Sequence, residues 1–202
     1  MIDVGDQVNR IRREANPGTV VLRRTYDTTI EDLWEACTDA ERISRWFLPV
    51  TGDLRLGGHY QLEGNAGGTV LKCEPPRMFR ITWQFGDLQP TEVEVRLSDT
   101  DDGVEFELEH VGYADPEMWR KFGPGAVGVG WDLGLLGLGL YLDTGATVGD
   151  PEEWQKTPEA HDFITRSSTA WGEAYRASGA SDTDAADAVR NTTAFYTGAP
   201  QE

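Results

Sequence analysis

The chain has 202 residues, with 18 lysines and arginines against 35 aspartates and glutamates, giving a formal net charge of −17. This length suits one domain with an elaboration, and the acidity argues against nucleic acid or an anionic membrane as a partner. Two cysteines, Cys37 and Cys73, are too few for a disulfide framework, and their apolar neighbours predict buried reduced thiols.

The first 26 residues predict an arm followed by a strand. Residues 1–18 carry a basic cluster and end in Asn16-Pro17-Gly18, so we expect a loosely held N-terminal arm. They lack the apolar core and small-residue cleavage site of an export signal, which favours a cytoplasmic protein. Residues 19–26 are rich in β-branched side chains and predict the first strand.

Two short helices are predicted next. Thr28 and Glu31 have the spacing of a capping box, and apolar residues then recur at helical spacing as far as Cys37. Asp39 can cap a second helix, which Pro49 stops.

Residues 52–110 alternate between apolar and polar side chains, with turn residues at short intervals, and predict an antiparallel meander. The alternation directs one set of side chains inward, including Tyr60, Phe79, Ile81, Trp83, Phe85, Val93, Val95, Leu97, Val104, Phe106 and Leu108. The same parity places His110 on the inward face.

Residues 123–142 predict a long helix in spite of their glycines, because Pro124 suits a first turn and apolar residues form two arcs. Trp131 and Leu135 lie on one arc, and Val129, Leu133, Leu136 and Leu140 form the other. Such a helix must be covered on most sides, which predicts a sheet on one face and another element opposite. A membrane span is disfavoured because Asp132 would lie at mid-bilayer. The helical wheel places Asp132 between the arcs, which predicts an exposed side chain.

Residues 151–202 predict a helical C-terminal extension. One helix begins at Thr157-Pro158 and ends near Gly179, and Ser181 can cap another. Both are amphipathic, so we expect them to cover the second arc of the long helix, or a second subunit to do so.

Several motifs resemble one family in their order and spacing. They are Trp34, Trp46-Phe47-Leu48-Pro49, Gly57-Gly58-His59-Tyr60, Gly68, Pro75-Pro76-Arg77, Ile81-Thr82-Trp83, Leu108-Glu109-His110-Val111-Gly112 and Gly130-Trp131 with Leu135 and Leu138. Over residues 19–142 the chain resembles the SRPBCC (START-like) superfamily and, within it, the AHSA1-like family, similar to the C-terminal domain of the Hsp90 ATPase activator.

This resemblance implies an α+β helix-grip fold, in which an antiparallel sheet curls around a long C-terminal helix. The expected organisation is an arm over 1–18, the helix-grip domain over 19–145 and the extension over 151–202. No segment resembles the activator's separate Hsp90-binding domain. The family commonly has Trp-Trp where this chain has Trp46-Phe47, a change that would alter pocket shape and leave the fold intact.

The family and the inward aromatics together predict a binding module that holds a small hydrophobic or aromatic molecule between sheet and helix. The expected lining is Trp46, Tyr60, Trp83, Phe85, Phe106, His110, Trp131 and Leu135. His110 would be the polar anchor. The simpler interpretation is that these aromatics and His110 only fill the core.

Two other function classes remain open. One is an enzyme of the cyclase or hydrolase kind that uses His110 in the same cavity. The other is an interaction protein, either a co-chaperone or a homodimer. We expect neither a metal site nor a cofactor, because the histidines and cysteines lack ligand spacing and no phosphate-binding glycine loop is present.

Overall fold

The computed structural model describes residues 3–112, 116–147 and 149–198. Its helices are α1 Val4–Asn9, α2 Ile30–Thr38, α3 Ala40–Trp46, α4 Pro116–Phe122, α5 Gly125–Thr144, α6 Pro151–Trp154, α7 Pro158–Ala177 and α8 Asp182–Thr197. Its strands are β1 Arg12–Asn16, β2 Thr19–Tyr26, β3 Val50–Gly52, β4 His59–Leu62, β5 Gly67–Glu74, β6 Met78–Trp83, β7 Thr91–Thr100 and β8 Gly103–Val111.

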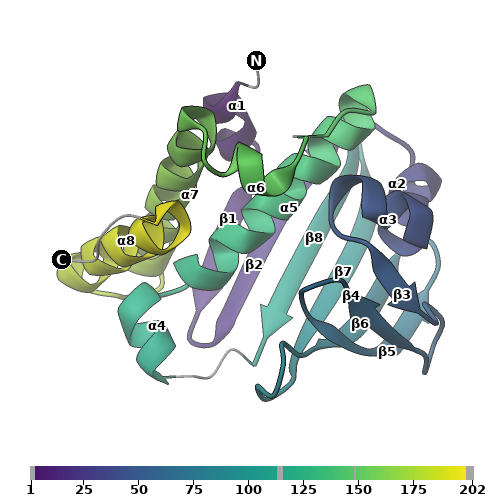
Figure 1. Cartoon of the computed structure of the whole chain (residues 1–202), viewed down its shortest axis with the longest axis horizontal. Helices are drawn as coiled ribbons and strands as arrows, with labels where there is room; N and C mark the ends of the chain where they lie inside the picture. The colour runs from purple at the N-terminus through teal and green to yellow at the C-terminus, as the bar shows by residue number, and fades with distance from the viewer. Residues whose placement is uncertain (1–2, 113–115, 148, 199–202) are drawn as a thin grey trace. The chain divides into compact units, whose positions relative to one another are not determined.

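The strands form one sheet in the order β1-β2-β8-β7-β6-β5-β4-β3 (Figure 1). Neighbouring strands from β3 to β8 pair antiparallel, as expected for the predicted meander. The α+β fold class, with its antiparallel sheet and long helix, is therefore confirmed.

The chain divides into two compact units. Unit 1 comprises residues 1–22, 113–136 and 148–202, and unit 2 comprises residues 23–112 and 137–147. Strand β2 and helix α5 each contribute residues to both units. The predicted domain boundaries near residues 18 and 145–151 stay a prediction.

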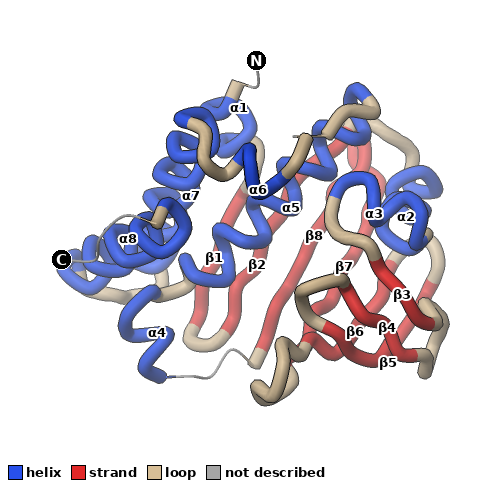
Figure 2. The backbone as a smooth tube through the Cα atoms, in the orientation of Figure 1, coloured by secondary structure: helices blue, strands red, loops and turns tan. Residues whose placement is uncertain are grey.

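In unit 2, β6, β7 and β8 lie side by side (Figure 2). Along β8, Val104, Phe106, Leu108 and His110 are buried, while the glutamates between them are half-buried. Alternation along an antiparallel strand separates a core face from a solvent face in this way.

The opposite face of this sheet carries a ladder of ion pairs. Arg80 Nε lies 2.6 Å from Glu94 Oε2, and Arg96 pairs with both Glu94 and Glu107. Arg23 Nε lies 2.5 Å from Glu107 Oε2. Glu94 has a side chain only 6% exposed, and the guanidinium groups of Arg80 and Arg96 both lie against its carboxylate.

Unit 1 contains the helical extension together with the N-terminal segment. Helices α7 and α8 lie against each other, and α7 also contacts α1 and β1 (Figure 1). The expectation of a loosely held arm over residues 1–18 is wrong for the described part of this stretch, because α1 and β1 lie within it. The side chains of Val4, Val8, Ile11 and Ala15 are buried.

The helix starts follow the predicted capping chemistry with one shift. Asp39, Thr157 and Ser181 cap α3, α7 and α8, each accepting a hydrogen bond from a backbone N–H three residues later. Helix α2 is capped by Thr29, one residue after the predicted Thr28. Thr28 instead donates its hydroxyl proton to Asp32.

Glycines in α5 allow large groups to approach its backbone closely. In unit 1, a Cβ at Gly128 would lie 2.1 Å from the Trp171 ring. In unit 2, a Cβ at Gly137 would lie 2.4 Å from the Trp46 carbonyl oxygen, and one at Gly139 would lie 2.4 Å from the Arg24 guanidinium. Each glycine thus leaves room that no other residue could leave.

Within the part of the chain that the structure describes, α5 is the one helix long and apolar enough to cross a membrane. Half of its most apolar stretch is buried in the protein. Its Asp132 is fully buried and paired with Arg13. A buried core helix can be as long and as apolar as a membrane-spanning helix, and the burial of α5 and the Asp132 ion pair are features of such a core helix.

We expect Gly128→Ala to lower the free energy of unfolding by about 2 kcal/mol, because the new methyl group must displace the fully buried Trp171 ring. Urea unfolding followed by circular dichroism measures this change. Gly5→Ala in α1 is the matched control, since its Cβ would find no neighbour closer than 3.6 Å. Equal stability of the two variants would contradict the close packing at Gly128.

Candidate functional site

Three residues from adjacent strands meet in unit 2. Trp83 ends β6, Thr91 begins β7 opposite it, and His110 lies near the end of β8. The Trp83 and His110 rings meet edge to face with centroids 6.3 Å apart and an interplanar angle of 64°. His110 is 3% exposed, so this is a buried polar group at the end of an apolar sheet face.

Hydrogen bonds connect the three residues. The Thr91 hydroxyl lies 2.9 Å from the main-chain carbonyl oxygen of Trp83 and 2.7 Å from His110 Nε2. Burial lowers the pKa of His110 from 6.5 to about 4 because an imidazolium loses its hydration there. At neutral pH the site therefore presents an uncharged imidazole.

Other predicted lining residues in unit 2 form part of its packed interior. Tyr60 is buried and donates its hydroxyl to the Thr82 carbonyl over 2.7 Å, and burial raises its pKa. Phe106 meets Tyr26 edge to face, with ring centroids 6.4 Å apart. The Tyr60 hydroxyl is satisfied within the fold and Phe106 has no polar group, so both offer apolar surface only.

Trp46 and Phe85 differ from these. Trp46 is half-buried and donates its Nε1–H to the Ala36 carbonyl over 2.9 Å. Phe85 is 53% exposed, so the prediction that it points inward is wrong. Strand β6 ends at Trp83, and Gly86, with φ of +56°, turns the chain immediately after Phe85. The strand alternation therefore does not extend to Phe85.

Trp131 and Leu135 belong to unit 1, where Trp131 is half-buried and Leu135 is 2% exposed. Of the predicted lining, the structure thus brings together Trp83 and His110. Sequence reasoning missed Thr91, although it has the same parity as Val93 in β7 and so shares the inward face.

Unit 1 holds a second buried polar cluster, around Asp132. One carboxylate oxygen accepts from Arg13 Nε over 2.9 Å, from Ser167 over 2.5 Å and from Trp171 Nε1 over 3.2 Å. Burial raises the pKa of Asp132, and the Arg13 charge and these hydrogen bonds oppose that rise. The prediction of an exposed Asp132 is wrong, because α7 and β1 supply buried partners.

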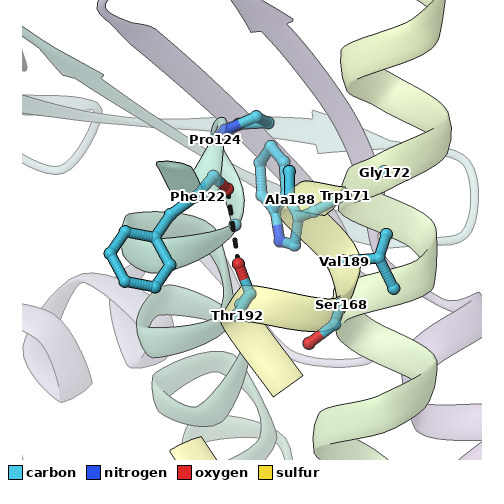
Figure 3. A pocket seen from close by; sticks show the side chains of 9 residues that line it. Phe122, Pro124, Ser168, Trp171, Gly172, Ala188, Val189 and Thr192 are labelled. Atoms are coloured by element: carbon cyan, nitrogen blue, oxygen red, sulfur yellow. Dashed lines mark hydrogen bonds between the residues drawn. The ribbon is translucent and has the colours of Figure 1, made fainter. Parts of the chain in front are cut away.

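A narrow crevice lies beside this cluster (Figure 3). It is lined by Phe122, Pro124, Gly125, Ser168, Trp171, Gly172, Ala188, Val189 and Thr192. Its free space is about 140 Å³ but is too narrow to hold a water molecule. The Thr192 hydroxyl donates across it to the Phe122 carbonyl over 3.3 Å. This crevice is a narrow gap between packed side chains of unit 1.

No group of three or more histidine, cysteine, aspartate or glutamate side chains could hold a metal ion within residues 3–112, 116–147 and 149–198. Cys37 is a poor nucleophile, because burial raises its thiol pKa to about 12.

The His110 pKa predicts a pH dependence of stability. Its folded value lies below its ordinary value, so the unfolded chain binds the proton more readily and stability falls as the pH drops from 6.5 towards 4. His110→Gln should remove roughly 2 kcal/mol of that loss between pH 6.5 and 4.5. Urea unfolding of both proteins at the two pH values checks this, and parallel losses would contradict a buried neutral His110.

Asp132→Asn should cost about 3 kcal/mol of stability, because it leaves the buried Arg13 without a counter-charge. Replacing both partners, as Arg13→Met with Asp132→Leu, should recover part of that loss, since no unpaired charge remains. Denaturant unfolding of the single and double variants measures the difference. A double variant less stable than Asp132→Asn would show that the unpaired charge of Arg13 is not the main cause of the lost stability.

Comparison with known proteins is consistent with this architecture. CalU16 from Micromonospora echinospora is 34% identical, and its crystal structure has a TM-score of 0.64 over 82% of this chain and 96% of that chain. Its solution structure has a TM-score of 0.67, with 84% and 97% covered. MLL2253 from Mesorhizobium loti shares the fold, at 24% identity and a TM-score of 0.55, over 62% and 96% of the two chains.

A search of curated proteins gives no match to this chain. The sequence profile of the activator of Hsp90 ATPase homolog 1-like family matches residues 27–142, more than half of the chain. The profile match and the CalU16 likeness confirm the resemblance seen in the sequence motifs, and the chain belongs to the AHSA1-like family of SRPBCC proteins.

Proposed function

We propose that unit 2 binds a small, uncharged, apolar or aromatic molecule, with His110 as its polar contact. The observation that carries this proposal is the neutral imidazole held between Thr91 and the half-buried Trp83 at the ends of three strands. Binding sites for small molecules typically combine apolar and aromatic walls with a few fixed polar groups.

The charge of the protein favours an uncharged ligand. The formal net charge of −17 repels anions. The sheet face that carries His110 also carries apolar side chains such as Val93 and Leu108, which would strip water from a charged ligand without compensating it.

The lowered pKa of His110 argues against the enzyme alternative. A general base works best when its pKa lies near the working pH. With a pKa of about 4, His110 is a weak base at pH 7, and it is better suited to hydrogen bonding than to proton transfer. The co-chaperone and homodimer alternatives, and the cytoplasmic location, stay predictions.

The direct test uses N-phenyl-1-naphthylamine, an uncharged fluorescent probe that brightens in apolar surroundings. Wild-type protein should bind it, and His110→Gln should weaken binding about fivefold to tenfold, the effect of one lost hydrogen bond. His59→Gln is the matched control, because His59 is exposed on β4. Absence of binding by the wild type, or equal affinity of all three proteins, would refute the proposal.

Tryptophan quenching by the probe should locate it. Trp83→Phe should remove most of the quenching, because Trp83 lies against His110. Trp154→Phe should leave the quenching unchanged, since Trp154 is a buried residue of unit 1 packed against Phe163. Undiminished quenching in Trp83→Phe would place the probe elsewhere.

A further inference from the structure

Thr91 lies in the proposed ligand site, between residues of the two strands that flank β7. It is the first residue of β7, opposite Trp83 in β6, and Val93 two residues later lies opposite His110 in β8. Its hydroxyl thus lies where it can reach both neighbouring strands. A Cβ at Gly112, where φ is +87°, would lie 3.7 Å from Thr91 Cα, so the end of β8 also packs against this residue.

The directions of the hydrogen bonds follow from counting protons. A threonine hydroxyl has one proton to donate, and a carbonyl oxygen can only accept. The Thr91 proton therefore goes to the Trp83 carbonyl, 2.9 Å away. At the 2.7 Å contact with His110 the hydroxyl must then accept, so Nε2 must carry the proton.

The other tautomer would leave this arrangement unsatisfied. With the proton on Nδ1, His110 Nε2 and the Trp83 carbonyl would compete for the single hydroxyl proton of Thr91. One acceptor would lose its hydrogen bond from Thr91 in a buried environment, which costs free energy.

We propose that Thr91 is a positioning residue that holds His110 as the neutral Nε2–H tautomer, with the ring edge-on to Trp83. Its importance for ligands rests on the proposed function of unit 2. The tautomer itself does not, because it is inferred from the hydrogen bonds that Thr91 makes with Trp83 and His110.

The test is ¹⁵N and ¹H NMR of histidine-labelled, full-length protein at pH 7. In the wild type, we expect His110 to show a proton on Nε2 that exchanges slowly with water, and an unprotonated Nδ1. Thr91→Val should shift this Nε2–H signal and speed its exchange, and Thr91→Ser should restore it, because serine keeps the hydroxyl.

Thr100→Val is the matched control. It makes the same change at the other end of the same strand, where the lost hydroxyl donates to the carbonyl of Gly103, the first residue of β8, over 3.0 Å. The His110 signals should stay unchanged in this variant. A comparable shift in Thr100→Val would mean that the His110 signals report general loosening of β7, and would overturn the assignment to Thr91.

A proton on Nδ1 in the wild type would overturn the proposal without any variant. An Nε2–H signal that is unaffected by Thr91→Val would also overturn it. If the Nε2–H tautomer and its dependence on Thr91 are found while N-phenyl-1-naphthylamine fails to bind, the positioning role stands and only the proposed ligand function fails.

Discussion

The structure depends on how closely large groups approach the backbone of α5. In unit 1 the Trp171 ring lies over Gly128, and in unit 2 the Trp46 carbonyl and the Arg24 guanidinium lie over Gly137 and Gly139. A glycine in a helix costs about 1 kcal/mol relative to alanine. These contacts offset that cost, because they allow a fully buried tryptophan and a fully buried arginine to pack directly on the helix.

The candidate site shows how a polar group is retained within an apolar sheet face. His110 keeps a hydrogen-bond partner in Thr91 and an aromatic neighbour in Trp83, and it is uncharged at neutral pH. In unit 1 the buried group is the carboxylate of Asp132, and Arg13, Ser167 and Trp171 all donate hydrogen bonds to it. In the first case burial suppresses the charge, and in the second a counter-ion and two hydrogen-bond donors compensate for it.

The sequence predicted what depends on short-range periodicity. Alternation along β8 correctly predicted a buried His110, and cap residues predicted the starts of α7 and α8. It failed where partners come from distant segments. A helical wheel treats Asp132 as a surface residue, yet Arg13 lies 119 positions away along the chain. The Thr91 hydroxyl likewise acquires its role only when three strands align.

The discontinuous make-up of unit 1 has a consequence for biosynthesis. Residues 1–22 leave the ribosome well before α7, whose side chains contact α1 and β1 in the folded unit. Contacts between such distant segments slow folding, since a long loop must close before any contact forms. Val4, Val8 and Ile11, which are buried in the folded unit, therefore lack their α7 partners until that helix has been synthesised.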